Sequence, residues 1–208
     1  MKRAILFFLF LAVALLLGCS SPSGKESSQD SSKQQPAADQ LETGRVALQK
    51  MIPPARFWSP DAKPVRMESE VMKDNNGQGG KSGFWRVTFA SSSTLKAETF
   101  TWSGMSNSDT PRGVDHGAAD SFNPSNRSTQ SFELGFLKVD SDKAFEVAQQ
   151  HGGKQLLAKN PTAGVRYVLD WDPQAGQLKW RVSYGGTDVS PLLSVTVNAS
   201  TGDFVHKE

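Results

Sequence analysis

Hydrophobic and polar side chains alternate along two widely separated stretches of the chain. Residues 83–90 place Trp85, Val87 and Phe89 on one side and polar side chains on the other. Residues 178–185 repeat the pattern, with WRVSY in place of WRVTF, 95 positions further on. Successive side chains of a β-strand point to opposite faces, so a period of two predicts a strand with one buried face in each stretch.

Shorter matches extend the likeness between these two stretches. Residues 100–102 align with 195–197 at the same offset of 95, and residues 65–67 resemble 165–167 at an offset of 100. A longer hairpin between the first two strands of the first copy accounts for the difference, because loop tips tolerate insertions at little cost. The pattern predicts two copies of a three-stranded antiparallel unit.

Helical periodicity precedes each predicted set of strands. In the first copy, apolar side chains at 41–52 share one helix face, and the prolines at 53–54 are expected to end the helix. In the second copy, a capping Asp-Ser pair precedes a helix at 142–151, which the glycines at 152–153 are expected to end. A further short strand is predicted at 132–139, ahead of the second helix.

The predicted fold class is α+β. It consists of tandem duplicated units, each with a helix packed on an antiparallel three- to four-stranded sheet. The first unit spans residues 39–104, the second spans 130–208, and residues 105–129 form a loop between them. A unit of this length buries little core by itself, so the two units are expected to pack together.

The second predicted unit resembles a PepSY-type domain. Its helix begins with Ser-Asp-Lys-Ala at 141–144, its middle strand carries Trp-Arg-Val at 180–182, and its last strand closes on Asn-Ala-Ser-Thr-Gly at 198–202. The family typically has an alanine at the helix start, W-x-V in a strand and D-A-x-T-G at the end, so Asn198 departs from its pattern. The resemblance covers residues 140–207. It implies a cystatin-like fold and a role in binding or restraining a peptidase or another envelope protein.

The N-terminus has the layout of an export signal. Lys2 and Arg3 precede an apolar run at 4–17, which is short for a membrane span. The run ends in Leu-Leu-Gly-Cys, which resembles the lipobox of bacterial lipoproteins. That resemblance implies a signal peptide at 1–18 that is removed, and acyl chains such as palmitate on Cys19. A simple signal peptide with a chance cysteine is the alternative.

The segment that follows the predicted cleavage site is a predicted tether. Residues 19–38 contain no large apolar side chain, so they cannot bury enough surface to offset the entropy of ordering and are expected to be disordered. Several acyl chains on Cys19 would hold the protein stably on a membrane without spanning it. Through the same resemblance, Ser20 indicates the outer membrane, facing the periplasm, in a Gram-negative cell.

Charge and cysteine content narrow the expected partners. The chain has 23 Lys and Arg against 21 Asp and Glu, a formal net charge of +2. Lys2 and Arg3 would leave with the signal peptide, so the mature protein is expected to be close to neutral and nucleic acid is not an expected partner. Cys19 is the single cysteine, which excludes an internal disulfide and a thiol enzyme elsewhere in the chain.

The long segment between the predicted units contains the candidate polar ligands. Asp109, Asp115, His116 and Asp120 could offer oxygen and imidazole ligands to a cation. However, the sequence has no EF-hand or zinc-protease spacing, and such residues are also common in turns. The prediction is therefore a loop with binding capability, without a metal site and without a cofactor.

An aromatic pair, Phe57 and Trp58, lies in a proline-flanked stretch that strand alternation does not explain. The pair is expected either to dock between the two units or to form a binding edge. No motif in the sequence gathers a nucleophile, a histidine and an acid, so no catalytic residue is predicted.

These patterns favour a membrane-anchored, non-enzymatic lipoprotein of the cell envelope. It would act as a protein- or peptide-binding module, with strand addition at an open sheet edge as one mode of binding, and would regulate a peptidase or another envelope protein. One alternative is a structural lipoprotein that braces an envelope assembly. The other is a hydrolase with an unrecognised site.

Overall fold

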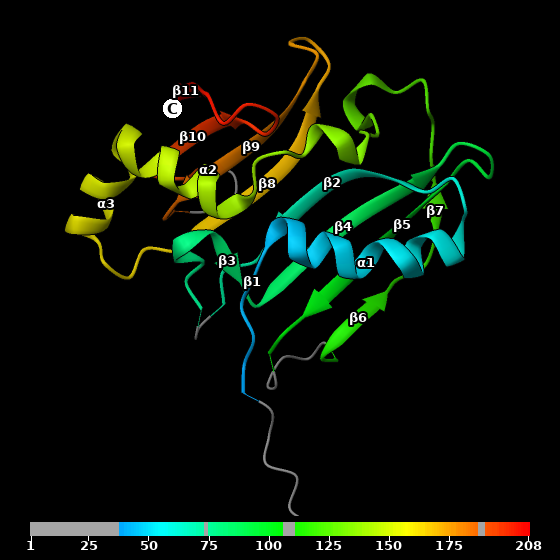
Figure 1. Cartoon of the computed structure of the whole chain (residues 1–208), viewed down its shortest axis with the longest axis horizontal. Helices are drawn as coiled ribbons and strands as arrows, with labels where there is room; N and C mark the ends of the chain where they lie inside the picture. The colour runs from blue at the N-terminus through cyan, green and yellow to red at the C-terminus, as the bar shows by residue number, and fades with distance from the viewer. Residues whose placement is uncertain (1–37, 73–74, 106–110, 187–189) are drawn as a thin grey trace, which may run out of the picture. The chain divides into compact units, whose positions relative to one another are not determined.

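The alternating segments become strands of one antiparallel sheet in the computed structural model of the chain (Figure 1). The structure describes residues 38–72, 75–105, 111–186 and 190–208, all of which belong to the unit Pro36–Glu208. Among these residues, nine strands join the sheet, and each pairs with its neighbours in antiparallel orientation.

Two sets of three long strands make up most of the sheet, with shorter strands at its edges. The strand order is β11-β10-β9-β8-β2-β4-β5-β6, and β7 also pairs with β5. The first set is β2 (Lys63–Ser69), β4 (Phe84–Ser91) and β5 (Lys96–Ser103), and the second is β8 (Val165–Asp172), β9 (Gln177–Tyr184) and β10 (Leu193–Asn198). The edge strands are β6 (Gly113–His116), β7 (Asp120–Ser121) and β11 (Phe204–Lys207), while β1 (Glu42–Thr43) pairs separately with β3 (Lys81–Ser82).

The two sets meet where β2 pairs with β8 in the middle of the sheet. Arg66 lies opposite Asp170, and Met67 lies opposite Leu169. Met67 and Leu169 are fully buried, so the apolar face of the sheet continues across the junction. The predicted α+β class with antiparallel strands is confirmed, and the strands of the two predicted units form one sheet.

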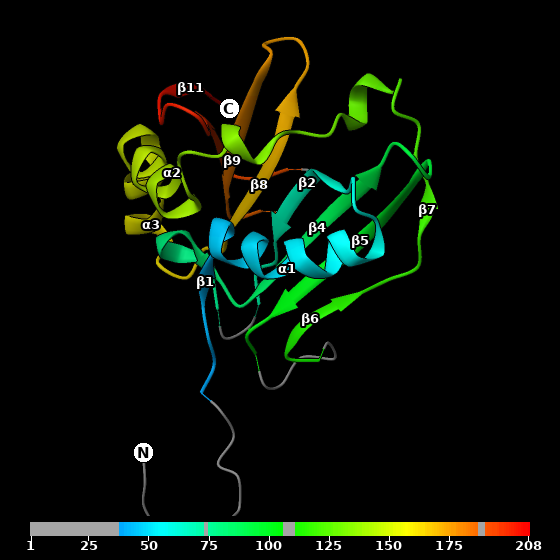
Figure 2. The same cartoon turned by 45° about the vertical axis from the view of Figure 1, so that its right-hand side comes forward.

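The helices lie on the same face of this sheet (Figures 1 and 2). α1 (Gly44–Trp58) contacts β2, β4 and β5, and α2 (Ser141–Ala148) contacts β9 and β10. A π-helical turn, Gln149–Gly153, joins α2 to α3 (Lys154–Lys159). The opposite face carries no helix of the described residues and is the open face of the sheet.

The tryptophans of the two WRV segments link each helix to the sheet. The Trp85 and Trp180 side chains are fully buried, and their ring centroids are 6.4 Å apart. Trp85 Nε1 donates a hydrogen bond to the carbonyl of Glu42, two residues before α1, and Trp180 Nε1 donates one to the carbonyl of Val139, two residues before α2. A buried indole N–H needs an acceptor, so each tryptophan fixes the point where its helix begins.

The N-termini of α1 and α2 meet at one carboxylate. Asp140 accepts hydrogen bonds from the backbone N–H of Ser141 at 2.7 Å and of Arg45 at 2.8 Å, and from the Thr43 hydroxyl at 2.6 Å. An aspartate at a helix N-terminus satisfies free N–H groups and interacts favourably with the helix dipole. Here a single aspartate serves two helices from different halves of the chain.

The first helix does not end at the prolines, contrary to the prediction. α1 continues through Pro53 and Pro54 to Trp58. A proline inside a helix removes a backbone hydrogen bond. However, Ala55 is fully buried one turn beyond Met51, and Trp58 packs against the core. Burial of the last turn therefore keeps it helical despite the missing bonds.

The second helix also extends further than predicted. The chain passes through the π-helical turn at Gly152 and Gly153 and continues as α3. Gly152 has a φ of +125°, a conformation that other residues rarely adopt, so it bends the chain without ending the helical segment. Leu156 and Leu157 of α3 pack against the core, which explains why the helix resumes.

Two further segments differ from their predicted structure. Residues 132–139, predicted as a strand, contain the 3₁₀ turn Leu134–Phe136, and the N–H groups of Lys138 and Val139 both donate to the carbonyl of Ala199. In the predicted loop 105–129, β6 and β7 pair with β5 and so cover the edge it would otherwise expose.

Candidate functional site

The predicted aromatic pair is split by the helix that carries it. Phe57 and Trp58 lie in the last turn of α1, where neighbouring side chains point in different directions. Trp58 is half-buried and packs edge-on against Phe100, with ring centroids 6.2 Å apart. Phe57 is 94% exposed. The two residues therefore do not form one aromatic surface.

His116 contacts the same phenylalanine as Trp58 does. Its ring stacks on Phe100 at 5.3 Å, and its Nδ1 is hydrogen-bonded to the carboxylate of Glu98. Glu98 is only 5% exposed and was missed from the sequence. Glu98 lies at an inward-facing position of β5, two residues before Phe100. A carboxylate at a position where alternation predicts an apolar side chain is the sequence signal that could have identified this residue.

The other predicted loop residues do not join His116. Asp115 precedes it in β6 and so points to the opposite face of the sheet. Asp120 lies in β7, where its carboxylate accepts a hydrogen bond from the N–H of Ser121. Asp109 and Cys19 lie outside the described residues. Within the part that is described, no group of three or more His, Cys, Asp or Glu side chains could hold a metal ion.

The open face of the sheet contains a groove of about 820 Å³. Strands from both halves of the chain line it, from β4 through β2, β8, β9 and β10 to β11. Its charged lining residues are Arg66, Glu68, Glu70, Arg86, Arg166, Lys179, Arg181, His206 and Glu208. Basic and acidic side chains therefore mix along a surface that spans the junction between the two halves.

Ion pairs hold several of these side chains in place. Glu68 lies between Arg66 and Arg86, with an N···O distance of 3.3 Å to each. Asp170 is 2.9 Å from Arg66 and 4.0 Å from Arg181. Ion pairs at a solvent-exposed surface contribute little to stability. The network therefore does more to order the charges on the open face than to stabilise the sheet.

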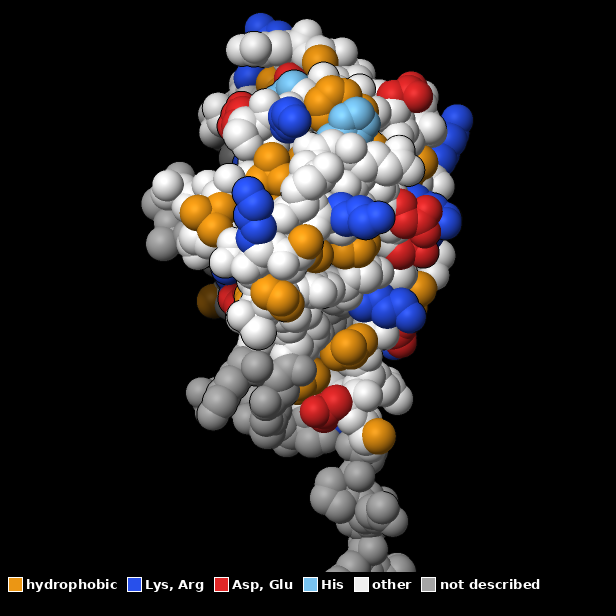
Figure 3. Space-filling model, turned by 90° about the vertical axis from the view of Figure 1, so that its left-hand side faces the viewer, with side chains coloured by type: hydrophobic (Ala, Val, Ile, Leu, Met, Phe, Trp, Pro, Cys, Tyr) orange, Lys and Arg blue, Asp and Glu red, His pale blue; other side chains and the backbone are white. Residues whose placement is uncertain are grey.

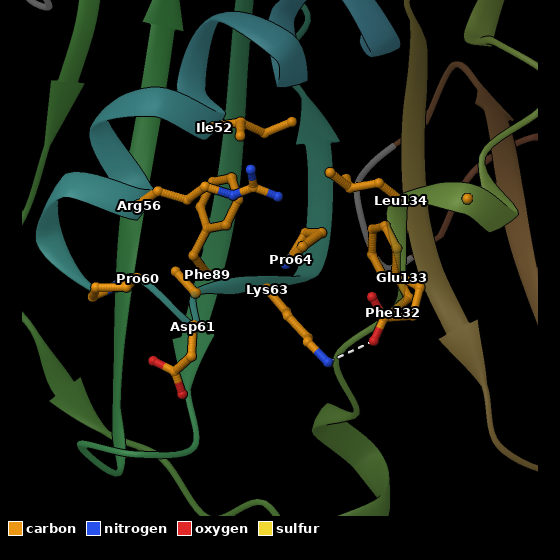
Figure 4. A pocket seen from close by; sticks show the side chains of 12 residues that line it. Ile52, Arg56, Pro60, Asp61, Lys63, Pro64, Phe89, Phe132, Glu133 and Leu134 are labelled. Carbon is orange, nitrogen blue, oxygen red and sulfur yellow. Dashed lines mark hydrogen bonds and ion pairs between the residues drawn. The ribbon is translucent and has the colours of Figure 1, made fainter.

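A second cavity, of about 250 Å³, lies on the helical face beside α1 (Figure 4). Three segments of the chain enclose it: α1, the turn into β2 and the segment before α2. Its lining residues are Ile52, Arg56, Pro60, Asp61, Ala62, Lys63, Pro64, Phe89, Phe132, Glu133, Leu134 and Gly135. This cavity could not be found from the sequence, because its walls come from segments about 70 residues apart.

One acidic group at the rim of this cavity is held by hydroxyl groups. The Asp61 carboxylate accepts hydrogen bonds from the side chains of Ser59, Ser91 and Ser93 and from the backbone N–H of Ser93. Hydrogen bonds from Ser91 and Ser93 favour the charged form and hold the pKa of Asp61 well below its ordinary value. Asp61 is therefore a fixed negative charge at neutral pH.

The side of the molecule that bears α2 and α3 has a mixed surface (Figure 3). Hydrophobic side chains appear there as small separate areas between Lys and Arg side chains. Scattered apolar side chains of this kind are normal on a folded protein. The described residues visible on this side form no broad apolar patch, so the groove is the better candidate for a binding surface.

Comparisons with known proteins give one informative match. No protein-family model matches the chain, and no curated protein does. A crystal structure of a protein described as a candidate lipoprotein from Clostridium difficile 630 is similar, with a TM-score of 0.51 and 12% sequence identity. The match covers 78% of this chain and 91% of the other. At this identity the likeness supports the α+β fold with its large antiparallel sheet, and the fold alone.

None of the helices in the described residues is both long enough and apolar enough to cross a bilayer.

Proposed function

We propose that this chain is a membrane-anchored, non-enzymatic lipoprotein of the cell envelope that binds a protein or peptide on the open face of its sheet. The observation that carries the proposal is the groove of about 820 Å³, lined by charges of both signs, on the face opposite the helices. Mixed charges in fixed positions favour a partner with a complementary pattern and disfavour other partners.

The dimensions of the groove suit a polypeptide. Six neighbouring strands spaced about 4.8 Å apart span about 24 Å, the length of about seven extended residues. Glu68 and Asp170 each lie near two arginines, so a partner can replace one ion pair with another at little cost.

The short edge strands β6 and β11 offer a second mode of binding, strand addition. A peptidase or another envelope protein is the partner class we propose.

We further propose that the two halves are duplicated, PepSY-like copies of one cystatin-like unit. Each half has a helix followed by three antiparallel strands, in the order expected for this unit. Trp85 and Trp180 also make equivalent hydrogen bonds to the chain two residues before each helix. The equivalence of these contacts supports the duplication beyond the short sequence motif.

The proposed anchor is Cys19, whose context is the Leu-Leu-Gly-Cys sequence after an apolar run. Lipidation at this residue would place the protein on the envelope membrane, and on the outer membrane in a Gram-negative cell. We expect the wild-type protein in the membrane fraction and Cys19→Ser as an uncleaved or soluble form without the mass of the acyl chains. Mass spectrometry of the N-terminal peptide measures this directly. An unmodified Cys19 in the mature protein would refute the anchor.

Binding at the open face is tested by cross-linking in cells with a photoreactive residue. The probe replaces Ser183, which lines the groove, and the matched control replaces Lys143, which is exposed on α2. We expect a discrete adduct from the Ser183 probe and none from the Lys143 probe. Arg181→Glu should reduce that adduct several-fold, because it reverses a charge of the groove.

Other outcomes of the same experiment would favour the alternatives. Equal adducts from both probe positions would contradict binding at the open face. Many adducts of different mass from both positions would favour a structural lipoprotein that braces an assembly.

A further inference from the structure

The cavity beside α1 has an apolar floor. Phe89 and Phe132 are part of its lining and are almost fully buried, at 1% and 3% exposed. Ile52, Pro64 and Leu134 complete the apolar wall (Figure 4). The backbone N–H of Phe132 donates to the carbonyl of Pro64 at 2.9 Å, which closes this wall. A small apolar group would lose its contact with water there.

The rim of the cavity carries four charged side chains, and three of them are already satisfied. Lys63 forms an ion pair with Glu133 at 2.5 Å across the mouth. The Asp61 carboxylate is occupied by serine hydroxyls and a backbone N–H. These three groups do not require a ligand.

Arg56 is the fourth charged residue of the rim. Its side chain extends from α1 across Phe89 toward Pro64, over the apolar floor (Figure 4). Among the described residues, its guanidinium makes no ion pair or hydrogen bond. A guanidinium presents paired N–H donors in a geometry that matches a carboxylate. The Arg56 side chain is exposed to solvent, so the cavity combines an apolar floor with one cation that has no protein partner among the described residues.

We propose that this cavity binds a carboxylate attached to an apolar group, with the carboxylate on Arg56 and the apolar group between Phe89 and Phe132. Two sources share this chemistry: a small free carboxylic acid, and the last residue of a polypeptide with an apolar side chain. A volume of about 250 Å³ suits a group of single-residue size. The cavity and the groove lie on opposite faces of the sheet, so this site does not depend on binding at the open face.

The experiment measures binding to the full-length protein by isothermal titration calorimetry. The probes are N-acetyl-phenylalanine, a peptide that ends in phenylalanine with a free carboxylate, and the amides of both. We expect the two acids to bind and the amides to bind at least tenfold more weakly, because the amides lack the charge that pairs with Arg56. A peptide acid that binds more tightly than N-acetyl-phenylalanine would indicate a polypeptide terminus as the source. Equal affinities would indicate a small acid.

The variants distinguish a loss of ligand binding at Arg56 from a loss of stability of α1. Arg56→Gln should reduce binding of both acids at least tenfold, and Arg56→Lys should recover part of it. Lys159→Gln is the matched control, because Lys159 is also a basic residue in the last turn of a helix. It should leave binding unchanged.

The proposal is overturned if acids and amides bind equally, if neither binds at millimolar concentration, or if Arg56→Gln changes only the stability. None of these results would alter the cross-linking from Ser183, so the two proposals fail independently.

Discussion

Replacing Trp180 with alanine should lower the free energy of unfolding by about 3–5 kcal/mol. The side chain is fully buried and contacts Trp85 edge-on. Its removal leaves a cavity in the core between the sheet and the helices and also leaves the carbonyl of Val139 without its indole donor. Both losses act at the point where α2 begins. Chemical denaturation followed by circular dichroism measures the change without relying on tryptophan fluorescence.

Trp171→Ala provides the matched control for this prediction. Trp171 lies in the neighbouring strand β8 and packs against Phe136, but it is only half-buried. Its replacement should cost about 1–2 kcal/mol, since less apolar surface returns to water. If the two variants unfold at the same denaturant concentration, the full burial of Trp180 in the core does not have the energetic effect assigned to it.

Gly80→Ala should lower the free energy of unfolding by about 2–4 kcal/mol. Gly80 has a φ of +77°, which disfavours any side chain, and an added Cβ would lie 2.2 Å from the Cα of Asp142 at the start of α2. The carbonyl of Gly80 accepts a hydrogen bond from Ser141, and its N–H donates to Tyr167. The backbone on both sides is therefore fixed and cannot move away from a new methyl group.

Gly79→Ala separates backbone conformation from steric contact. Gly79 has nearly the same φ, +78°, but an added Cβ would have no atom within 4 Å. Gly79→Ala should lower the free energy of unfolding only by the cost of placing alanine at a positive φ, about 1 kcal/mol. The difference between the two variants in urea denaturation is thus the effect of the contact with α2. Equal losses would mean that the loop and α2 are not in close contact.

Much of the fold could be predicted because the long strands are half-buried. Apolar and polar side chains alternate over the whole of β9 and from Trp85 to Phe89 in β4, so the period is visible in the sequence. The end of α1 could not be predicted in the same way. Pro53 and Pro54 normally end a helix, and the packing of Ala55 and Trp58 against the core reverses that local preference.

The candidate sites were less predictable because they depend on strand order. The outward positions of Glu68 and Asp170 follow from alternation, but the proximity of both residues to Arg66 depends on the pairing of β2 with β8. No local pattern specifies that pairing. The cavity around Arg56 depends similarly on a segment that returns to α1 from a distant part of the chain.

The pairing of β2 with β8 also has the geometry of a two-fold axis. Residues 65–67 and 165–167 match at an offset of 100, so Glu68 and Val168 are equivalent positions, and they lie directly opposite each other. An isologous dimer of single units would place two copies of the same residue at this point, because each position on the axis meets itself. If the halves are copies, as we propose, joining them in one chain allows a glutamate to face a valine there. It also allows the two halves to carry different binding surfaces, which a symmetric dimer cannot do.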